Sequence, residues 1–142
     1  MCSFYKVLDH VSDAYIEVTG ESLEECFEKA GLSVVDFMVD LTTISESESY
    51  DFQAKGFDLE SLLYNFLEEV LVKASTGEFL AKSIKTRLEK TREGYLIKGE
   101  ARGEPFSCDR HRPKLEVKAV TYHLMEIKKE DRRFIFRFLL DL

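Results

Sequence analysis

Proline, glycine and cysteine are scarce in this 142-residue sequence, and tryptophan is absent. Two prolines and seven glycines exclude a collagen-like or low-complexity chain. The three cysteines are odd in number and share no C-x-x-C spacing, so the sequence supports neither a disulfide framework nor a zinc ribbon. No apolar run is long enough to cross a bilayer, and the first residues do not resemble a secretion signal. We therefore expect a soluble, cytoplasmic protein without a membrane partner.

Positive charge is also in short supply. The formal net charge of -7 disfavours binding dominated by nucleic-acid phosphates, which requires a basic surface. An excess of carboxylates suits hard cations such as calcium, magnesium or manganese instead. The phosphate-binding, dinucleotide-binding, serine-hydrolase and zinc-protease motifs are all missing. The sequence therefore shows no independent catalytic machinery, and we expect a protein that is not an enzyme.

What is present is the composition of an ordinary globular domain, with 44% hydrophobic residues, and residues 1–142 are predicted to form a single domain. Apolar steps of three and four residues predict two amphipathic helices, one opening with a capping box at Ser22 and Glu25 and one capped by Asp58. Alternating or continuous apolar stretches predict strands at residues 4–8, 14–18, 50–55, 79–90, 95–102, 114–128 and 133–140.

This order, β-β-α-β-α-β-β-β-β, predicts an α+β fold. We expect two layers, with the two helices packed on a mixed, mostly antiparallel sheet. The strands near 46–56 and 79–102 are candidates for a subsidiary lobe. Apolar helix residues such as Phe27, Phe37 and Phe66 are expected in the core because they follow the helical spacing.

The stretch "LDHVSDA" places Asp9, His10 and Asp13 in a short polar break between two predicted strands. Considered alone, this stretch favours a turn in which Asp9 or Ser12 bonds its own backbone. Asp141 and the α-carboxylate of Leu142 add anionic oxygens at the other end of the sequence. If the last strand runs beside the first, Asp13, Asp141 and Leu142 form a cluster suited to a hard divalent cation. The alternative is that Asp141 only keeps a chain end solvated.

A second chemistry-bearing stretch is "RGEPFSCDRHRPKLEVKAVTYH". Strand alternation places Lys118 and Tyr122 on one face and His123 on the other, unless a bulge intervenes. A lone strand histidine such as His123 is more often a hydrogen-bonded core residue than a ligand. Cys108 near His111 suggests a thiolate or soft-metal site, but no third partner is evident.

Taken together, "LDHVSDA", "GESLEECFEKA", "RGEPFSCDRH", "VKAVTYH" and the terminal "LLDL" resemble the archease family, in the right order over essentially the whole chain. The resemblance implies a cytoplasmic protein cofactor of an RtcB-type RNA ligase in tRNA splicing, which promotes guanylylation and multiple turnover of the ligase. It also implies that Asp13, Asp141 and Leu142 bind a divalent cation. Lys118 corresponds to the motif lysine. Asp9, His10, Tyr122 and His123 lie in the motifs and are candidate supporting residues.

Two motifs depart from the family pattern. Val11 replaces a threonine in the first motif, which removes a hydroxyl from the turn, and Ser107-Cys108 replaces a more typical Asp-Pro. The implied partners are the ligase, tRNA only within the ligase complex, and a second copy of the chain where the protein self-associates. Two rival functions stay open: a stand-alone metal-dependent phosphoesterase, and a metal-free, chaperone-like interaction protein.

Overall fold

The structure is a computed structural model that describes residues 12–142. The expected strand at residues 4–8 and the candidates Asp9 and His10 lie outside the described residues. The elements are β1 (Asp13–Gly20), α1 (Leu23–Met38), η1 (Leu41–Thr43), β2 (Glu48–Gly56), α2 (Leu59–Ser75), β3 (Leu80–Thr91), β4 (Gly94–Glu104), β5 (Ala119–Glu130) and β6 (Arg133–Asp141). Over residues 12–142 the predicted α+β class and the order of helices and strands are confirmed, but the expected two-layer packing on one mixed sheet is wrong, because the strands form two separate sheets.

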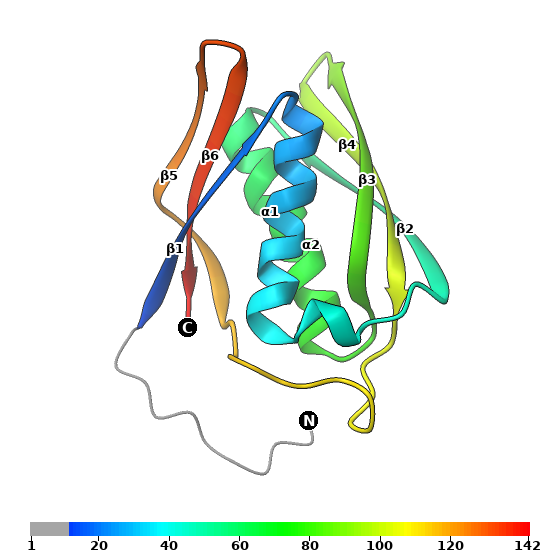
Figure 1. Cartoon of the computed structure of the whole chain (residues 1–142). Coiled ribbons are helices and arrows are strands. Elements are labelled where there is room, and N and C mark those ends of the chain that lie inside the picture. Colours follow the sequence, from blue (N-terminus) through cyan, green and yellow to red (C-terminus); the bar gives the residue numbers. More distant parts are fainter. Residues whose placement is uncertain (1–11) are drawn as a thin grey trace.

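The strands divide into two three-stranded sheets, with orders β1-β6-β5 and β2-β4-β3. The two helices lie between the sheets (Figure 1). Every strand pair among the described residues is antiparallel. The strands near 46–56 and 79–102, predicted to pair, form the β2-β4-β3 sheet. No helix of residues 12–142 is long and apolar enough to span a membrane.

Both helices begin where the sequence predicts. The Ser22 hydroxyl accepts a hydrogen bond from the Glu25 N–H at 3.1 Å, and Asp58 caps α2 in a capping box with Ser61. These bonds satisfy N–H groups that have no partner within the helix. Apolar residues then follow along one face of each helix, and burial of that face supplies most of the stability that a helix of this length lacks alone.

The extended segment 112–118 crosses the end of α1. The N–H groups of Lys114 and Leu115 donate to the carbonyls of Met38 and Phe37 at 2.8 and 3.0 Å. These bonds satisfy helix carbonyls that would otherwise lack a partner. Because these residues bond the helix end, the strand predicted from Lys114 begins only at Ala119.

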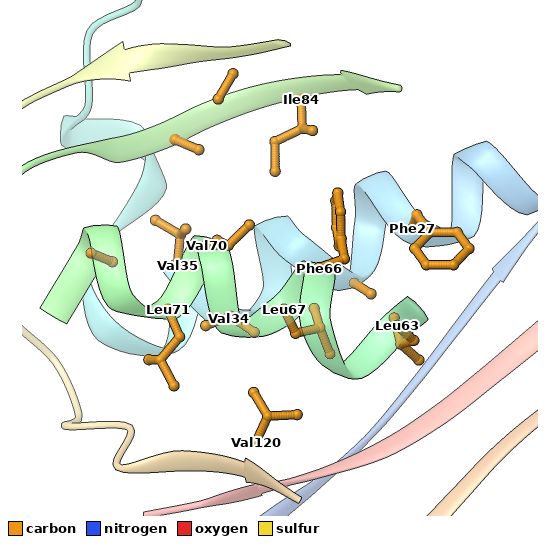
Figure 2. Close-up of a cluster of buried hydrophobic side chains, with 14 of the residues drawn as sticks. Phe27, Val34, Val35, Leu63, Phe66, Leu67, Val70, Leu71, Ile84 and Val120 are labelled. Atoms are coloured by element: carbon orange, nitrogen blue, oxygen red, sulfur yellow. The ribbon is translucent and has the colours of Figure 1, made fainter. Parts of the chain in front are cut away.

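The core is made of side chains from both helices and both sheets (Figure 2). Phe27, Phe66 and Phe136 are fully buried. The Phe27 ring meets those of Phe66 and Phe136 edge-on, with centroids 5.4 and 5.0 Å apart, an arrangement that aromatic rings favour. Phe37, also expected in the core, is partly buried and packs against it.

Candidate functional site

Strand β6 brings the two ends of the described chain together. The strand register places Asp13 directly opposite Asp141. The Leu142 N–H donates to the Ser12 carbonyl at 2.9 Å, so Ser12 and Leu142 form a hydrogen-bonded pair. Because hydrogen-bonded and non-hydrogen-bonded pairs alternate, Asp13 and Asp141 form a non-hydrogen-bonded pair, in which side chains lie closest. The two carboxylates therefore project from one face at neighbouring positions.

Lys118 lies on the other side of Asp141. Its N–H donates to the Asp141 carbonyl at 2.7 Å, immediately before β5 begins. Asp13, Asp141 and Lys118 are exposed, and Leu142 is half-buried. The end of this sheet thus gathers Asp13, Asp141, Leu142 and Lys118, which we call the carboxylate tip.

Charges elsewhere on the same sheet face are paired. Arg137 of β6 donates to Glu17 of β1 at 3.2 Å and to Glu126 of β5 at 2.8 Å. At the tip, by contrast, neither Asp13 nor Asp141 has a basic side chain within ion-pair distance among residues 12–142. Like charges placed directly opposite each other destabilise a sheet, so this arrangement favours a cation that offsets them.

The donor set at the tip fits a hard cation, because it consists of carboxylate oxygens with open positions for water. Within the described residues no three His, Cys, Asp or Glu side chains gather closely enough to hold a metal ion. The metal ligands predicted from the sequence, Asp13, Asp141 and Leu142, are the residues that lie together at the tip. Metal binding there stays a prediction.

A bulge interrupts β5 beside the predicted supporting residues. The pairing with β6 shifts between Thr121 and Glu126, and Leu124 has a φ of 61°. The expected strict alternation therefore stops at Thr121. His123 is exposed rather than part of the core, and its backbone N–H bonds the Thr121 hydroxyl at 3.0 Å. The interpretation of His123 as a core residue is wrong, because its side chain is exposed to solvent.

Tyr122, on the same bulge, stacks on Tyr64 of α2 with ring centroids 4.4 Å apart and planes 7° apart. Its side chain is nevertheless 52% exposed. Burial, followed by the neighbouring Tyr64 and Asp58, raises the pKa of the Tyr122 phenol. The phenol therefore stays neutral near pH 7 and acts as an aromatic surface with a hydrogen-bonding hydroxyl.

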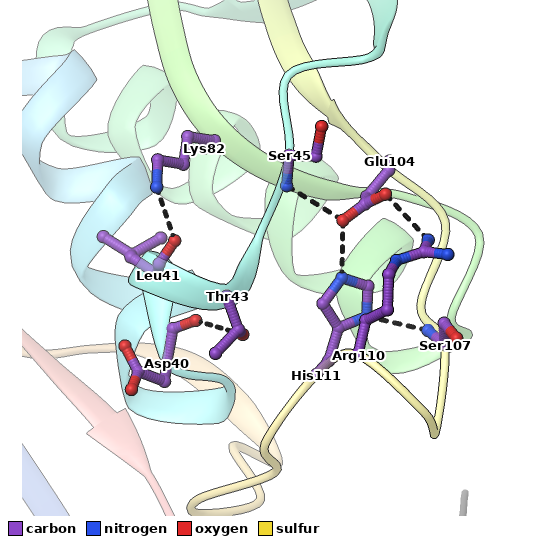
Figure 3. A network of polar contacts seen from close by, with 9 residues as sticks. All are labelled: Asp40, Leu41, Thr43, Ser45, Lys82, Glu104, Ser107, Arg110 and His111. Carbon is purple, nitrogen blue, oxygen red and sulfur yellow. Dashed lines mark hydrogen bonds and ion pairs between the residues drawn. The ribbon is translucent and has the colours of Figure 1, made fainter.

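Sequence reasoning missed a buried polar network around Glu104 (Figure 3). The Glu104 carboxylate accepts from the Ser45 N–H at 2.9 Å, lies 2.8 Å from His111 Nε2 and accepts from Arg110 at 2.7 Å. Glu104 and His111 are only 4% and 3% exposed. Burial raises the pKa of Glu104, but the Ser45 N–H, His111 and Arg110 outweigh it and hold that pKa below its usual value.

This network links two loops by hydrogen bonds and is not a reactive centre. Because His111 Nδ1 accepts the Ser107 N–H at 2.7 Å, both ring nitrogens are engaged. His111 therefore has no nitrogen left to activate a thiol or to bind a metal, and Cys108 is not free of partners either. The thiolate hypothesis for Cys108 and His111 receives no support. The only sequence signal for the network is the acidic residue between Gly103 and Pro105, at the end of a strand.

Comparison with known proteins gives a consistent result. A family model described as the archease protein family matches residues 5–142. A protein archease from Pyrococcus abyssi is 39% identical over 135 residues, covering 94% of this chain and 95% of that protein. A protein archease from Danio rerio is 36% identical over 132 residues, covering 93% of this chain and 82% of that protein.

Two solved structures share the fold. The solution structure of Methanobacterium thermoautotrophicum protein 1598 is 34% identical, with a TM-score of 0.81 over 95% of this chain and 96% of that one. A crystal structure described as an archease and possible chaperone from Thermotoga maritima aligns over the full length of both chains with a TM-score of 0.64. Its identity of 18% makes it evidence for the fold alone.

Proposed function

Because the chain belongs to the archease family, we propose that it is a protein cofactor of an RtcB-type RNA ligase in tRNA splicing. In this proposal the protein is not itself an enzyme. It acts in the cytoplasm, promotes guanylylation and repeated turnover of the ligase, and meets tRNA only within the ligase complex. Self-association is compatible with this role.

The observation that carries the proposal is the pairing of Asp13 with Asp141 at the exposed end of one sheet. We infer that Asp13, Asp141 and Leu142 hold a calcium, magnesium or manganese ion there. When bound, such an ion neutralises charge on phosphoryl oxygens during nucleotidyl transfer. The chain's own part is to orient the carboxylates on a paired strand end. Lys118, fixed through its backbone to Asp141, adds a positive charge beside them.

An RNA ligation assay with a matched ligase tests this proposal under multiple-turnover conditions, with and without the protein. Asp13→Ala and Asp141→Ala should abolish the stimulation while leaving the fold intact, because both side chains are exposed. Asp51→Ala is the matched control, since Asp51 is an exposed strand aspartate that faces the acidic residue Glu100. Full stimulation by the Asp141→Ala protein would contradict the proposal.

A chaperone-like role is the second candidate, favoured by the exposed apolar side chains of Phe57, Tyr122 and Leu124. A protein that only shields an aggregation-prone partner would still rescue the ligase in the presence of a chelator and after loss of either aspartate. The stand-alone phosphoesterase predicts phosphoester hydrolysis by the isolated protein, measured without ligase.

A further inference from the structure

A cavity separate from the carboxylate tip opens where the two sheets approach α2. Its volume is about 600 Å³, and its walls come from the end of β2, the start of α2, the β3–β4 turn and the β5 bulge. The residues that matter below are Phe57, Tyr122, Tyr95, Lys55, Arg92 and Asn65. Neither the carboxylates of the tip nor the Glu104 network belongs to it.

Two aromatic side chains line this cavity with large exposed surfaces. Phe57 is 77% exposed and Tyr122 is 52% exposed. Tyr122 is held in place because one face of its ring is stacked on Tyr64. Among the ring contacts of residues 12–142, Phe57 and Tyr122 do not stack on each other. The cavity therefore offers two aromatic side chains to a flat ligand. Exposing apolar rings to water is unfavourable, and packing within the described residues leaves both of them largely uncovered.

The backbone that carries Phe57 is fixed rather than loose. A Cβ added at Gly94, whose φ is 148°, would lie 2.3 Å from the Gly56 carbonyl oxygen and 2.6 Å from the Phe57 Cα. A Cβ added at Gly56 would lie 2.3 Å from the Leu62 nitrogen. The Gly56–Phe57 backbone is thus clamped between the β3–β4 turn and the first turn of α2. This contact fixes the backbone of Phe57 beside the cavity, which limits the entropy that its ordering would cost on binding.

The polar groups of the cavity narrow the ligand class. Two cations, Lys55 and Arg92, line it against one carboxylate, Glu93. Asn65 is held by its amide N–H to the Lys55 carbonyl at 2.7 Å, which directs that side chain along the wall. Aromatic faces next to cations and an amide are the chemistry that recognises a base and a phosphate together.

We propose that this cavity is a nucleotide-binding site. The base stacks on Phe57 and Tyr122, and Lys55 and Arg92 receive the phosphate. The nucleotide is either free in solution or part of an exposed RNA strand, since both present the same chemistry. This inference does not rest on the carboxylate tip or on ligase activation.

Titration of the isotope-labelled protein by NMR tests the site, with guanosine, adenosine and uridine 5′-monophosphates in one arm and a short single-stranded RNA in the other. Inorganic phosphate serves as a probe without a base. We expect saturable shifts of the Phe57 and Tyr122 signals with nucleotide or RNA and none with phosphate. Phe57→Ala and Arg92→Gln should each weaken binding about tenfold, as loss of a stacking or cationic contact does. Both side chains are exposed, so both variants should fold.

Controls separate this site from general surface effects. Val72→Ala removes an exposed apolar side chain of α2 that does not line the cavity, and Arg132→Gln removes an exposed arginine at the β5–β6 turn. Both should bind as the unmodified protein does, and so should Asp141→Ala, whatever its effect on ligation. The proposal is overturned if neither mononucleotide nor RNA shows saturable binding up to about 1 mM. Equal binding by the Phe57→Ala and unmodified proteins overturns it as well.

Discussion

Replacing Asp141 by asparagine tests whether the carboxylate tip is built for a cation. Asp13 and Asp141 form a non-hydrogen-bonded cross-strand pair with no basic partner among residues 12–142. Side chains in such pairs have Cβ atoms roughly 5 Å apart, and like charges placed there destabilise a sheet by about 0.2–1 kcal/mol. Coulomb repulsion between two charges at about 5 Å in water gives the same order, ~0.8 kcal/mol. Asp141→Asn should therefore raise the free energy of unfolding by that amount in chelator.

A bound cation should reverse which of the two proteins is the more stable. An ion present at about 100 times its dissociation constant stabilises the folded state by ~2.7 kcal/mol, provided that it binds the folded chain alone. The unmodified protein gains this stability and the Asp141→Asn protein loses most of it, because one of its carboxylate ligands has become a neutral amide. The variant should therefore be the more stable protein in chelator and the less stable one in calcium, magnesium or manganese.

Urea unfolding followed by circular dichroism measures both free energies, once in chelator and once with each ion. Asp51→Asn is the control, because Asp51 also faces an acidic residue, Glu100, but lies on the other sheet with Lys85 opposite that glutamate. Its stability should not depend on the divalent ion. The reasoning fails if Asp141→Asn destabilises the protein in chelator, or if none of the three ions stabilises the unmodified protein more than the variant.

Three further outcomes follow from the buried groups. Glu104→Ala should lower the free energy of unfolding at pH 7 by about 3 kcal/mol, because it leaves buried His111 without its partner. The pKa of Glu104 is lowered in the folded state, so the stability that its charge contributes is full above its unfolded pKa of about 4.3 and is lost as pH falls through the folded value. The difference in free energy of unfolding between the variant and the unmodified protein should therefore become smaller in acid. Phe66→Ala removes a fully buried ring and should cost about 3–5 kcal/mol, measured by urea or thermal unfolding. Cys26 should resist iodoacetamide in the folded protein at pH 8 and react after unfolding, as peptide mass spectrometry reports, because burial raises the pKa of its thiol to about 11.

The helices were predictable because their signals are local. Ser22 and Asp58 mark the N-termini of the two helices. The apolar spacing indicates the buried face of each helix, which includes Phe27 in one and Phe66 in the other. Strand positions were also local, but strand partners were not. Nothing in the alternation of β2 or β6 specifies that the strands divide between two sheets with the helices in between, since pairing depends on long-range packing.

The site was predictable to the same degree. The register opposes Asp13 and Asp141, as the sequence led us to expect if the last strand runs beside the first, while metal ligation there stays a prediction. The β5 bulge carried no signal, because no glycine or proline marks Leu124, and the sequence did not indicate that His123 is exposed rather than buried. No sequence pattern predicted that Glu104 is buried, since a glutamate is rarely buried and its partners come from two different loops.

The central place of β6 in its sheet has a consequence for how the chain reaches its native state. Within the described residues β1 and β5 each pair with β6 and not with each other, and the Glu17–Arg137 bond spans 120 residues of sequence. The β2-β4-β3 sheet and α2 are formed by segments that are close in sequence, so they can assemble before β1 pairs with β6. Contacts of such long sequence separation form slowly, because closing the loop costs entropy before any pairing is gained. We therefore expect the carboxylate tip to form late in folding, after the β2-β4-β3 sheet and the two helices.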